Sequence, residues 1–321
     1  MKIDVFTHAV PASLMKALAG VAPDLVAHTE QVPTLFDMER RFAIMDRYPD
    51  VLQVPTLALT AARILDDPRH AVEFARRAND SMAELAASHP ARFAAGTASV
   101  PTTDLDAAVE ELDRALGKLN LRGVQLFTPM KGRPLDLAGW LPLFETAALF
   151  DLPIWIHPVM PIDRSDYTKY FVDHVFGWPY ESTKAMSGLA LDGLFERLPR
   201  AKVIIHHCGA MAPFFEARIA EAYYGSAVVH SMRHEGLKRP LVDYMKRFYG
   251  DTALSGGTSG LMCGYAFFGP EHLLFGTDTP YDAELGDRST RQTMASVDSM
   301  AIPAEERDLI YYGNARRLLN L

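Results

Sequence analysis

The stretch STKAMSGLALDGLFERLPRAKVIIHH, residues 182–207, carries the pattern that decides the fold. Its first part, from Ser182 to Pro199, has the spacing of an amphipathic helix that ends at a proline. Its last part, KVIIHH (202–207), is short and rich in β-branched residues, which is typical of a strand. A helix that leads into such a strand is one repeat of a β/α architecture, and this strand ends on two histidines.

The same alternation of short β-rich runs and longer helical runs extends along the whole chain. The predicted strands are residues 2–6, 51–59, 92–100, 122–127, 153–157, 202–207, 247–253 and 273–278. Helices are predicted between them, among them 67–90, flanked by Pro68 and Pro90, and 102–119, which opens with a Thr/Asp cap.

Eight strands that alternate with helices over 321 residues predict one α/β domain, a (β/α)8 TIM barrel spanning 1–321. A doubly wound open sheet is the structural alternative. It lacks its usual support, because no Gly-x-Gly-x-x-Gly follows an early strand.

Composition narrows the kinds of partner. The net charge of −8 makes nucleic acid and anionic membranes poor partners. The two cysteines, Cys208 and Cys263, lie far apart, which argues against a disulfide scaffold and fits a reducing compartment. Neither a signal peptide nor an apolar run long enough to span a membrane is recognisable, so a cytoplasmic location is predicted.

Candidate reactive residues cluster at the ends of predicted strands, where barrel enzymes place their chemistry. Four of the eight strands end there in histidine or aspartate: His8, His157, the pair His206 and His207, and Asp278. A lone histidine at a strand end is more often structural, but four such ends at one rim predict a functional site. Imidazole and carboxylate are the usual ligands of zinc and similar divalent ions.

The first of these strands raises a question. Many metal-dependent hydrolases open on a strand that ends His-x-His, because residues two apart on a strand point the same way. In DVFTHAVP (4–11) the second position is His8 but the first is Phe6, which cannot bind a metal. The chain is therefore a metal enzyme short of one ligand, an enzyme without metal, or a protein with an ordinary buried strand.

The long segment after the fifth predicted strand is predicted to act as a lid. It is an insertion at about 159–180, and a loop of this length at the active rim of a barrel often covers the site. His174 and Trp178 lie in it and are candidate substrate contacts.

Several motifs together resemble the amidohydrolase-related (amidohydrolase 2) family that contains aminocarboxymuconate-semialdehyde decarboxylase and resorcylate-type decarboxylases. The matching pieces include IDVFTHAVP, HPARFAAGTASVP, GVQLF, LPIWIHP, KVIIHHCGAMAPFFEARI, LLFGTDTPYD and YYGNARRLL. They span nearly the whole chain, and the segments around His157, His207 and Asp278 are the specific ones. The resemblance implies a TIM barrel like those of metal-dependent hydrolases.

Carried over position by position, the family's metal ligands match His8, His157 and Asp278. Its histidine that activates water or a substrate group matches His207 rather than His206, because Gly209 and Pro213 fix the register. The resemblance implies a divalent cofactor, with zinc favoured over manganese or magnesium. Phe6 replaces the family's first-strand ligand, so two outcomes stay open. In the first, the three remaining ligands hold the ion, and water or substrate oxygens complete its coordination. In the second, Phe6 fills the space of the missing ligand, and metal binding is weakened or lost.

Two arginines carry further expectations from the resemblance. Arg41 matches an arginine that grips a substrate carboxylate, as a guanidinium does in bidentate fashion. The alternative is that Arg41 pairs with Asp46 or a glutamate of its own helix. Arg218 matches an arginine that reaches the neighbouring subunit's site, so a homodimer is predicted.

The leading functional hypothesis is a non-oxidative decarboxylase of a small aromatic or unsaturated carboxylic acid, with His207 and Asp278 as the catalytic residues. A hydrolase or hydratase on the same scaffold is the second hypothesis, since one fold supports both chemistries. The third, motivated by Phe6, is a non-catalytic binder of small molecules.

Overall fold

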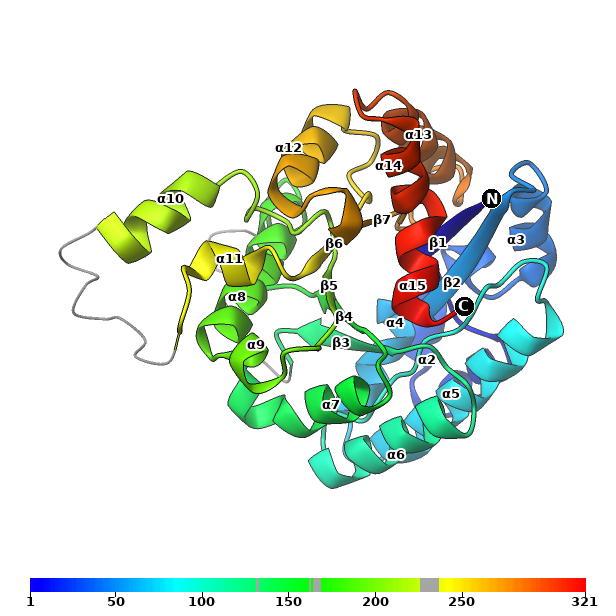
Figure 1. Cartoon of the computed structure of the whole chain (residues 1–321). Coiled ribbons are helices and arrows are strands. Elements are labelled where there is room, and N and C mark those ends of the chain that lie inside the picture. Colours follow the sequence, from blue (N-terminus) through cyan, green and yellow to red (C-terminus); the bar gives the residue numbers. More distant parts are fainter. Residues whose placement is uncertain (131–132, 162, 164–168, 226–236) are drawn as a thin grey trace.

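The computed structural model describes residues 1–321 except 131–132, 162, 164–168 and 226–236 (Figure 1). The strands are β1 Lys2–Ala9, β2 Val51–Leu57, β3 Val124–Thr128, β4 Ile154–Pro158, β5 Val203–Ile205, β6 Tyr249–Asp251 and β7 Leu273–Leu274. The first helices are α1 Ala12–Val21, α2 Pro23–Glu30, α3 Met38–Met45, α4 Leu59–Ala62, α5 Ala71–Ser88, α6 Leu105–Gly117 and α7 Leu137–Leu149. The later helices are α8 Trp178–Leu191, α9 Leu194–Arg197, α10 Glu216–Ala220, α11 Leu241–Met245, α12 Thr258–Phe268, α13 Asp287–Asp298, α14 Ala304–Asp308 and α15 Asn314–Leu319.

The strands close into a parallel barrel, which confirms the predicted fold class. β1 pairs with β2, and β3 to β7 form a five-stranded parallel sheet in sequence order. Bridges from Gln53 to Phe93 and from Ala98 to Val124 connect the two sheets on one side. A bridge from Thr7 to Thr279 closes the other side. The helices surround these central strands (Figure 1).

The third predicted strand, 92–100, is irregular and pairs only through isolated bridges. Its neighbour β2 carries Pro55, which has no N–H to donate to a ladder. Contact with β2 continues at Thr97, which donates both its backbone N–H and its hydroxyl to the Pro55 carbonyl, at 3.2 and 3.1 Å. The barrel position is therefore filled, but no continuous strand forms there.

The helix predictions were right in kind, but one predicted helix begins elsewhere and is divided in two. α5 and α6 lie inside their predicted ranges, and the side chain of Asp104 caps α6 by accepting from Ala107 N. The helix predicted over 182–199 begins earlier, at Trp178. It is also divided between α8 and α9, because Gly193 adopts a left-handed φ of 78° that ends an α-helix.

Hydrogen bonds between β1 and the segment after β7 set up the site. Val5 N donates to Phe275 O at 2.9 Å, Asp278 N to Phe6 O at 2.8 Å, and His8 N to Thr279 O at 2.8 Å. The backbone of Asp278 is thereby held against the strand that carries His8. Among the described residues, no helix is both long and apolar enough to cross a membrane.

Candidate active site

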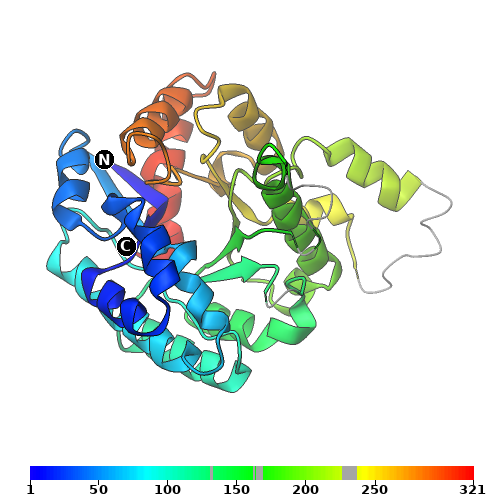
Figure 2. The same cartoon turned by 180° about the vertical axis from the view of Figure 1, so that it is seen from behind.

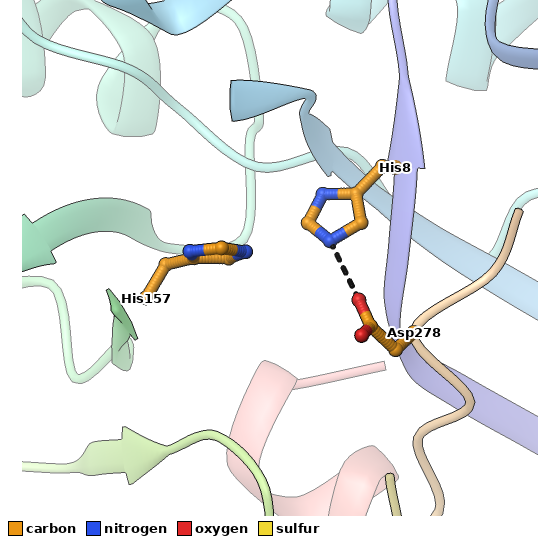
Figure 3. Close-up of side chains that lie close together, drawn as sticks. All are labelled: His8, His157 and Asp278. Atoms are coloured by element: carbon orange, nitrogen blue, oxygen red, sulfur yellow. Dashed lines mark hydrogen bonds and ion pairs between the residues drawn. The ribbon is translucent and has the colours of Figure 1, made fainter. Parts of the chain in front are cut away.

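Three predicted metal ligands converge at the C-terminal ends of the strands. His8 of β1, His157 of β4 and Asp278, which follows β7, each offer a ligand atom, and these atoms all lie within 4.8 Å of one another. His8 and His157 are buried, and the side chain of Asp278 is 33% exposed. Figure 3 shows the two imidazoles and the carboxylate facing a common space.

The hydrogen bonds of His8 orient its ring toward Asp278. Thr56 Oγ1 donates its hydrogen to Thr7 O at 3.1 Å, so it accepts from His8 Nδ1 at 2.9 Å. A neutral His8 then carries no hydrogen on Nε2, which lies 3.1 Å from Asp278 Oδ1. Two acceptors at this distance need a cation or a proton between them. A metal ion bound here would be such a cation.

His157 and Asp278 hold the protonation states that metal ligands require. His157 Nδ1 donates to Pro158 O at 2.6 Å, which leaves the Nε2 lone pair free. Burial and the neighbouring His8 lower the pKa of His157 well below its usual value, so the imidazole is neutral. Burial acts to raise the pKa of Asp278, but the facing imidazoles of His207 and His8 outweigh it and hold the carboxyl ionised. The neutral imidazole of His157, the carboxylate of Asp278 and the imidazole of His8 together fit a divalent ion.

The predicted catalytic pair, His207 and Asp278, is in contact. His207 Nε2 lies 3.6 Å from Asp278 Oδ2. Burial acts to lower the pKa of His207, but the facing carboxylate of Asp278 raises it above its usual value. Both residues have left-handed backbones, with φ of 57° and 61°, a conformation that is unfavourable outside glycine and gathers at functional sites.

The neighbouring His206 points into the barrel instead. It is fully buried, and its Nδ1 lies 2.7 Å from Asp251 Oδ2. Of this histidine pair, the structure therefore places His207 rather than His206 beside Asp278, as the register of Gly209 and Pro213 predicts.

Phe6 lies at the centre of the histidines. Its ring stacks on His206 with the centroids 3.4 Å apart and the planes at 13°. The Phe6 centroid is also 4.9 Å from that of His8, and 5.6 Å from those of His157 and His207. The phenyl ring thus fills space beside the predicted ligands and offers no lone pair of its own.

Arg41 has partners that differ from both sequence-based expectations. Its side chain is almost fully buried, and its guanidinium donates to Gln53 Oε1 at 2.7 and 2.9 Å and to the His8 carbonyl at 2.6 Å. It pairs with neither Asp46 nor a glutamate of α3, and it is absent from the cavity that holds His157 and Asp278. In this geometry Arg41 supports the strand that carries His8, and its grip on a substrate carboxylate stays a prediction.

The remaining predicted contacts fall in two places. His174 and Trp178 line the same cavity as His157 and Asp278, and their own rings lie 4.4 Å apart. Arg218 is exposed on α10, a helix that stands away from the barrel in both views (Figures 1 and 2). Within one chain, the structure does not bring Arg218 to the site.

The predicted lid, 159–180, is described in part, since 162 and 164–168 lie outside the described residues.

The cavity above the ligands has a volume of about 440 Å³, within the range of ligand pockets. Sequence reasoning missed several of its walls, namely Leu59, Thr60, Ser255, Thr277, Tyr281, Asp282 and Ser289. Tyr281 is the most informative, because its ring lies 5.3 Å from His8. Burial and the charge of Asp278 raise the pKa of Tyr281, so its hydroxyl remains a donor. The sequence signal that points to it is the motif GTDTPYD (276–282), in which Tyr281 follows Asp278 by three residues.

Beneath the ligands, the buried carboxyl of Asp4 joins β1 to the segment that carries Asp278. It accepts from Thr277 Oγ1 at 2.6 Å, from Thr277 N at 3.1 Å and from Phe6 N at 3.2 Å. Burial raises the pKa of Asp4 to about 7. Since this folded-state pKa lies above its ordinary value, the contribution of Asp4 to stability is complete at low pH and is lost as pH rises through about 7.

We therefore expect Asp4→Asn to flatten the dependence of stability on pH. Asparagine keeps an acceptor for the two backbone N–H groups but does not ionise. The difference in unfolding free energy between wild type and variant should shrink by up to ~3–4 kcal/mol as pH rises from about 4 to 7, since one pKa unit is about 1.4 kcal/mol. Urea unfolding across this pH range measures it, and parallel curves for the two proteins would contradict the expectation.

Two features define the class of protein to which this chain belongs. The strands form a closed parallel barrel, and their ends bring together two histidines and an aspartate, which are residues of metal-ligating type. The chain belongs to the amidohydrolase family, whose model matches residues 3–321.

Known proteins of this kind resemble the chain over most of its length. Gamma-resorcylate decarboxylase of Polaromonas sp. strain JS666 is 29% identical over 333 residues, covering 100% of this chain and 98% of that one. The 2-amino-3-carboxymuconate-6-semialdehyde decarboxylase of Dictyostelium discoideum is 27% identical over 258 residues, covering 79% of this chain and 68% of that one. A dihydroxybenzoic acid decarboxylase from Polaromonas sp. JS666, solved with bound manganese and the inhibitor 2-nitroresorcinol, is 26% identical with a TM-score of 0.81 and covers 100% of this chain and 97% of that one.

Proposed function

We propose that this protein is a metal-dependent, non-oxidative decarboxylase of a small aromatic carboxylic acid. The observation that carries the proposal is the group of His8, His157 and Asp278 in one cavity, with His207 beside Asp278. The decarboxylase relatives support the reaction class, and the manganese in one of them supports a divalent cofactor. The proposed ion is therefore manganese or zinc, of which zinc is the metal favoured from the sequence.

Each polar group of the site has a role in this reaction. His8, His157 and Asp278 would hold the ion, and a bound divalent ion supplies a Lewis acid for substrate oxygens. His207, whose pKa is raised by Asp278, holds a proton at Nε2 next to that carboxylate. The pair delivers this proton to the ring carbon that bears the carboxyl group. The electrons of the breaking carbon–carbon bond remain with the ring, and carbon dioxide leaves.

The walls of the cavity suit an aromatic acid. The indole of Trp178 lies 5.8 Å from His157 and gives a flat apolar surface beside the ligands. The hydroxyl of Tyr281 and the exposed His174 offer donors to substrate oxygens. In this proposal, Trp178 and His174 bind substrate, and segment 159–180 covers it.

A homodimer is part of the proposal. Arg218 lies on the projecting helix α10, next to Phe214 and Phe215, which are 79% and 38% exposed. An exposed aromatic pair beside this projecting helix favours contact with a second subunit, whose site Arg218 would reach. Sedimentation at micromolar concentration tests the assembly, and an active monomer would refute it.

The test of the proposed reaction is carbon dioxide release from a panel of aromatic acids. Protein stripped with a chelator and reloaded with manganese or zinc would be incubated with gamma-resorcylate and 2-hydroxybenzoate. We expect carbon dioxide and the matching phenol from at least one acid, loss of activity on chelation, and recovery on reloading. Turnover of esters or amides without carbon dioxide would favour the hydrolase alternative. Binding of the acids without any turnover would favour a non-catalytic binder.

A further inference from the structure

A second cavity of about 470 Å³ adjoins the one that holds the predicted ligands. Leu59, Thr60 and Trp178 line both cavities, so the two share a wall. The second cavity is formed at the C-terminal ends of β2, β3 and β4, on the same rim of the barrel as the site. None of His8, His157 and Asp278 lines it.

Apolar side chains dominate the walls of this second cavity. Leu65 and Met130 are nearly buried, and Val159 and Met160 complete the apolar lining. The ring of Phe127 lines it too, and its centroid lies 5.5 Å from that of His157, which places the cavity directly beside the predicted metal site.

The polar groups of the lining mostly have hydrogen-bond partners within the protein. Thr102 Oγ1 donates to the carboxylate of Asp66 and lies 3.0 Å from Leu65 O. Thr60 Oγ1 lies 2.9 Å from Thr29 Oγ1, and the indole N–H of Trp178 is directed at Met160 Sδ at 3.2 Å. Arg63 is exposed, at the solvent side. A ligand in this space therefore gains mainly from burying apolar surface.

We propose that the second cavity is a subsite for an apolar substituent of the substrate. This inference rests on the proposed function: the carboxyl-bearing ring lies beside His157 and Asp278, and an alkyl or aryl group on that ring extends past Trp178 toward Phe127 and Met130. The substrate class is thereby narrowed to aromatic acids that carry a sizeable hydrophobic side group. The size of the first cavity alone, about 440 Å³, already accommodates an unsubstituted ring.

A series of 2-hydroxybenzoates with hydrogen, methyl, propyl and pentyl at ring positions 4 or 6 tests the subsite. Binding to the manganese-loaded protein is measured by calorimetry, and turnover by carbon dioxide release. At one of the two positions, we expect Kd to fall by about threefold for each methylene that enters the cavity, because burying a CH2 group is favourable. KM should fall in the same series while kcat changes little, since the side group is bound equally in the ground and transition states.

Variants that fill the second cavity test whether the gain in affinity from the side group arises there. Ala62→Leu and Met130→Trp add volume to its wall, and they should remove most of the gain from the pentyl group while leaving the Kd of 2-hydroxybenzoate within about threefold. Ala87→Leu, on the exposed side of α5, is the matched control and should leave both values unchanged. Melting temperatures establish that each variant is folded.

The outcomes separate this inference from the proposed function. If 2-hydroxybenzoate binds and is turned over but chain length has no effect, the subsite is refuted and the decarboxylase proposal stands. If the gain persists in both folded filling variants, the side group lies elsewhere and the subsite is again refuted. If no acid of the series binds, the proposed function fails and the subsite fails with it.

Discussion

Replacing Asp278 with asparagine is expected to lower decarboxylase turnover by at least ~10³-fold. The carboxylate lies 3.1 Å from His8 Nε2 and 3.6 Å from His207 Nε2, so one substitution removes a charged metal ligand and the partner that keeps His207 protonated. General acid–base catalysis alone typically contributes 10²–10⁴-fold. Steady-state carbon dioxide release, together with metal analysis of the purified variant, measures both losses.

Asp282→Asn is the matched control for this substitution. Asp282 lines the same cavity, but its carboxylate accepts from Ser289 N and Oγ at 2.9 and 2.6 Å and from Glu284 N at 2.7 Å. We expect its turnover to stay within about tenfold of wild type and its metal content to stay unchanged. Comparable losses in both variants would show that charge in the cavity, rather than the position of Asp278, is what activity requires.

The sequence predicts the part of the site in which a residue's place at the end of a strand determines where its side chain lies in the fold. His8 and His157 lie at the ends of β1 and β4, while His207 and Asp278 follow β5 and β7. The parallel strands of a barrel bring their C-terminal ends to one rim. Their convergence therefore required only the correct fold class and the correct register at His207.

Other features depend on contacts between distant segments, which no local pattern reports. Arg41 lies on a helix with a regular pattern, yet it is buried because Gln53 and the His8 carbonyl approach it from two strands. Tyr281 reaches His8 only because the chain turns back over the rim after Asp278. The second cavity is likewise defined by segments that meet only in the folded barrel.

For Phe6, the sequence and the structure together make it possible to test whether position 6 can supply a metal ligand. The sequence left open whether its ring fills the place of a ligand or packs elsewhere in the core. In the structure the ring lies between His206, on which it stacks, and His8, whose centroid is 4.9 Å away. Phe6 and His8 are two residues apart on β1, the spacing at which side chains of a strand share a face.

Phe6→His is therefore expected to tighten metal binding by ~10-fold or more. An added protein ligand that contributes about 1.4 kcal/mol to binding lowers Kd tenfold. The metal-free variant should also be less stable by roughly 1–3 kcal/mol, because a buried imidazole without a partner replaces an apolar ring that is fully buried. Added metal should restore much of this stability, since an ion that binds only the folded state raises the unfolding free energy. Calorimetric titration with manganese and zinc, alongside thermal unfolding with and without metal, measures the three effects.

Phe6→Leu separates the new ligand from the loss of the ring. Leucine also leaves space beside His206, so it should destabilise the protein to a similar extent, but it offers no lone pair and should leave metal affinity unchanged. Equal affinities in the histidine and leucine variants would mean that position 6 cannot reach the ion, and Phe6 would then be a packing residue. A gain confined to Phe6→His would instead show that the chain retains the frame of a four-ligand site, in which an aromatic ring stands where a protein ligand fits.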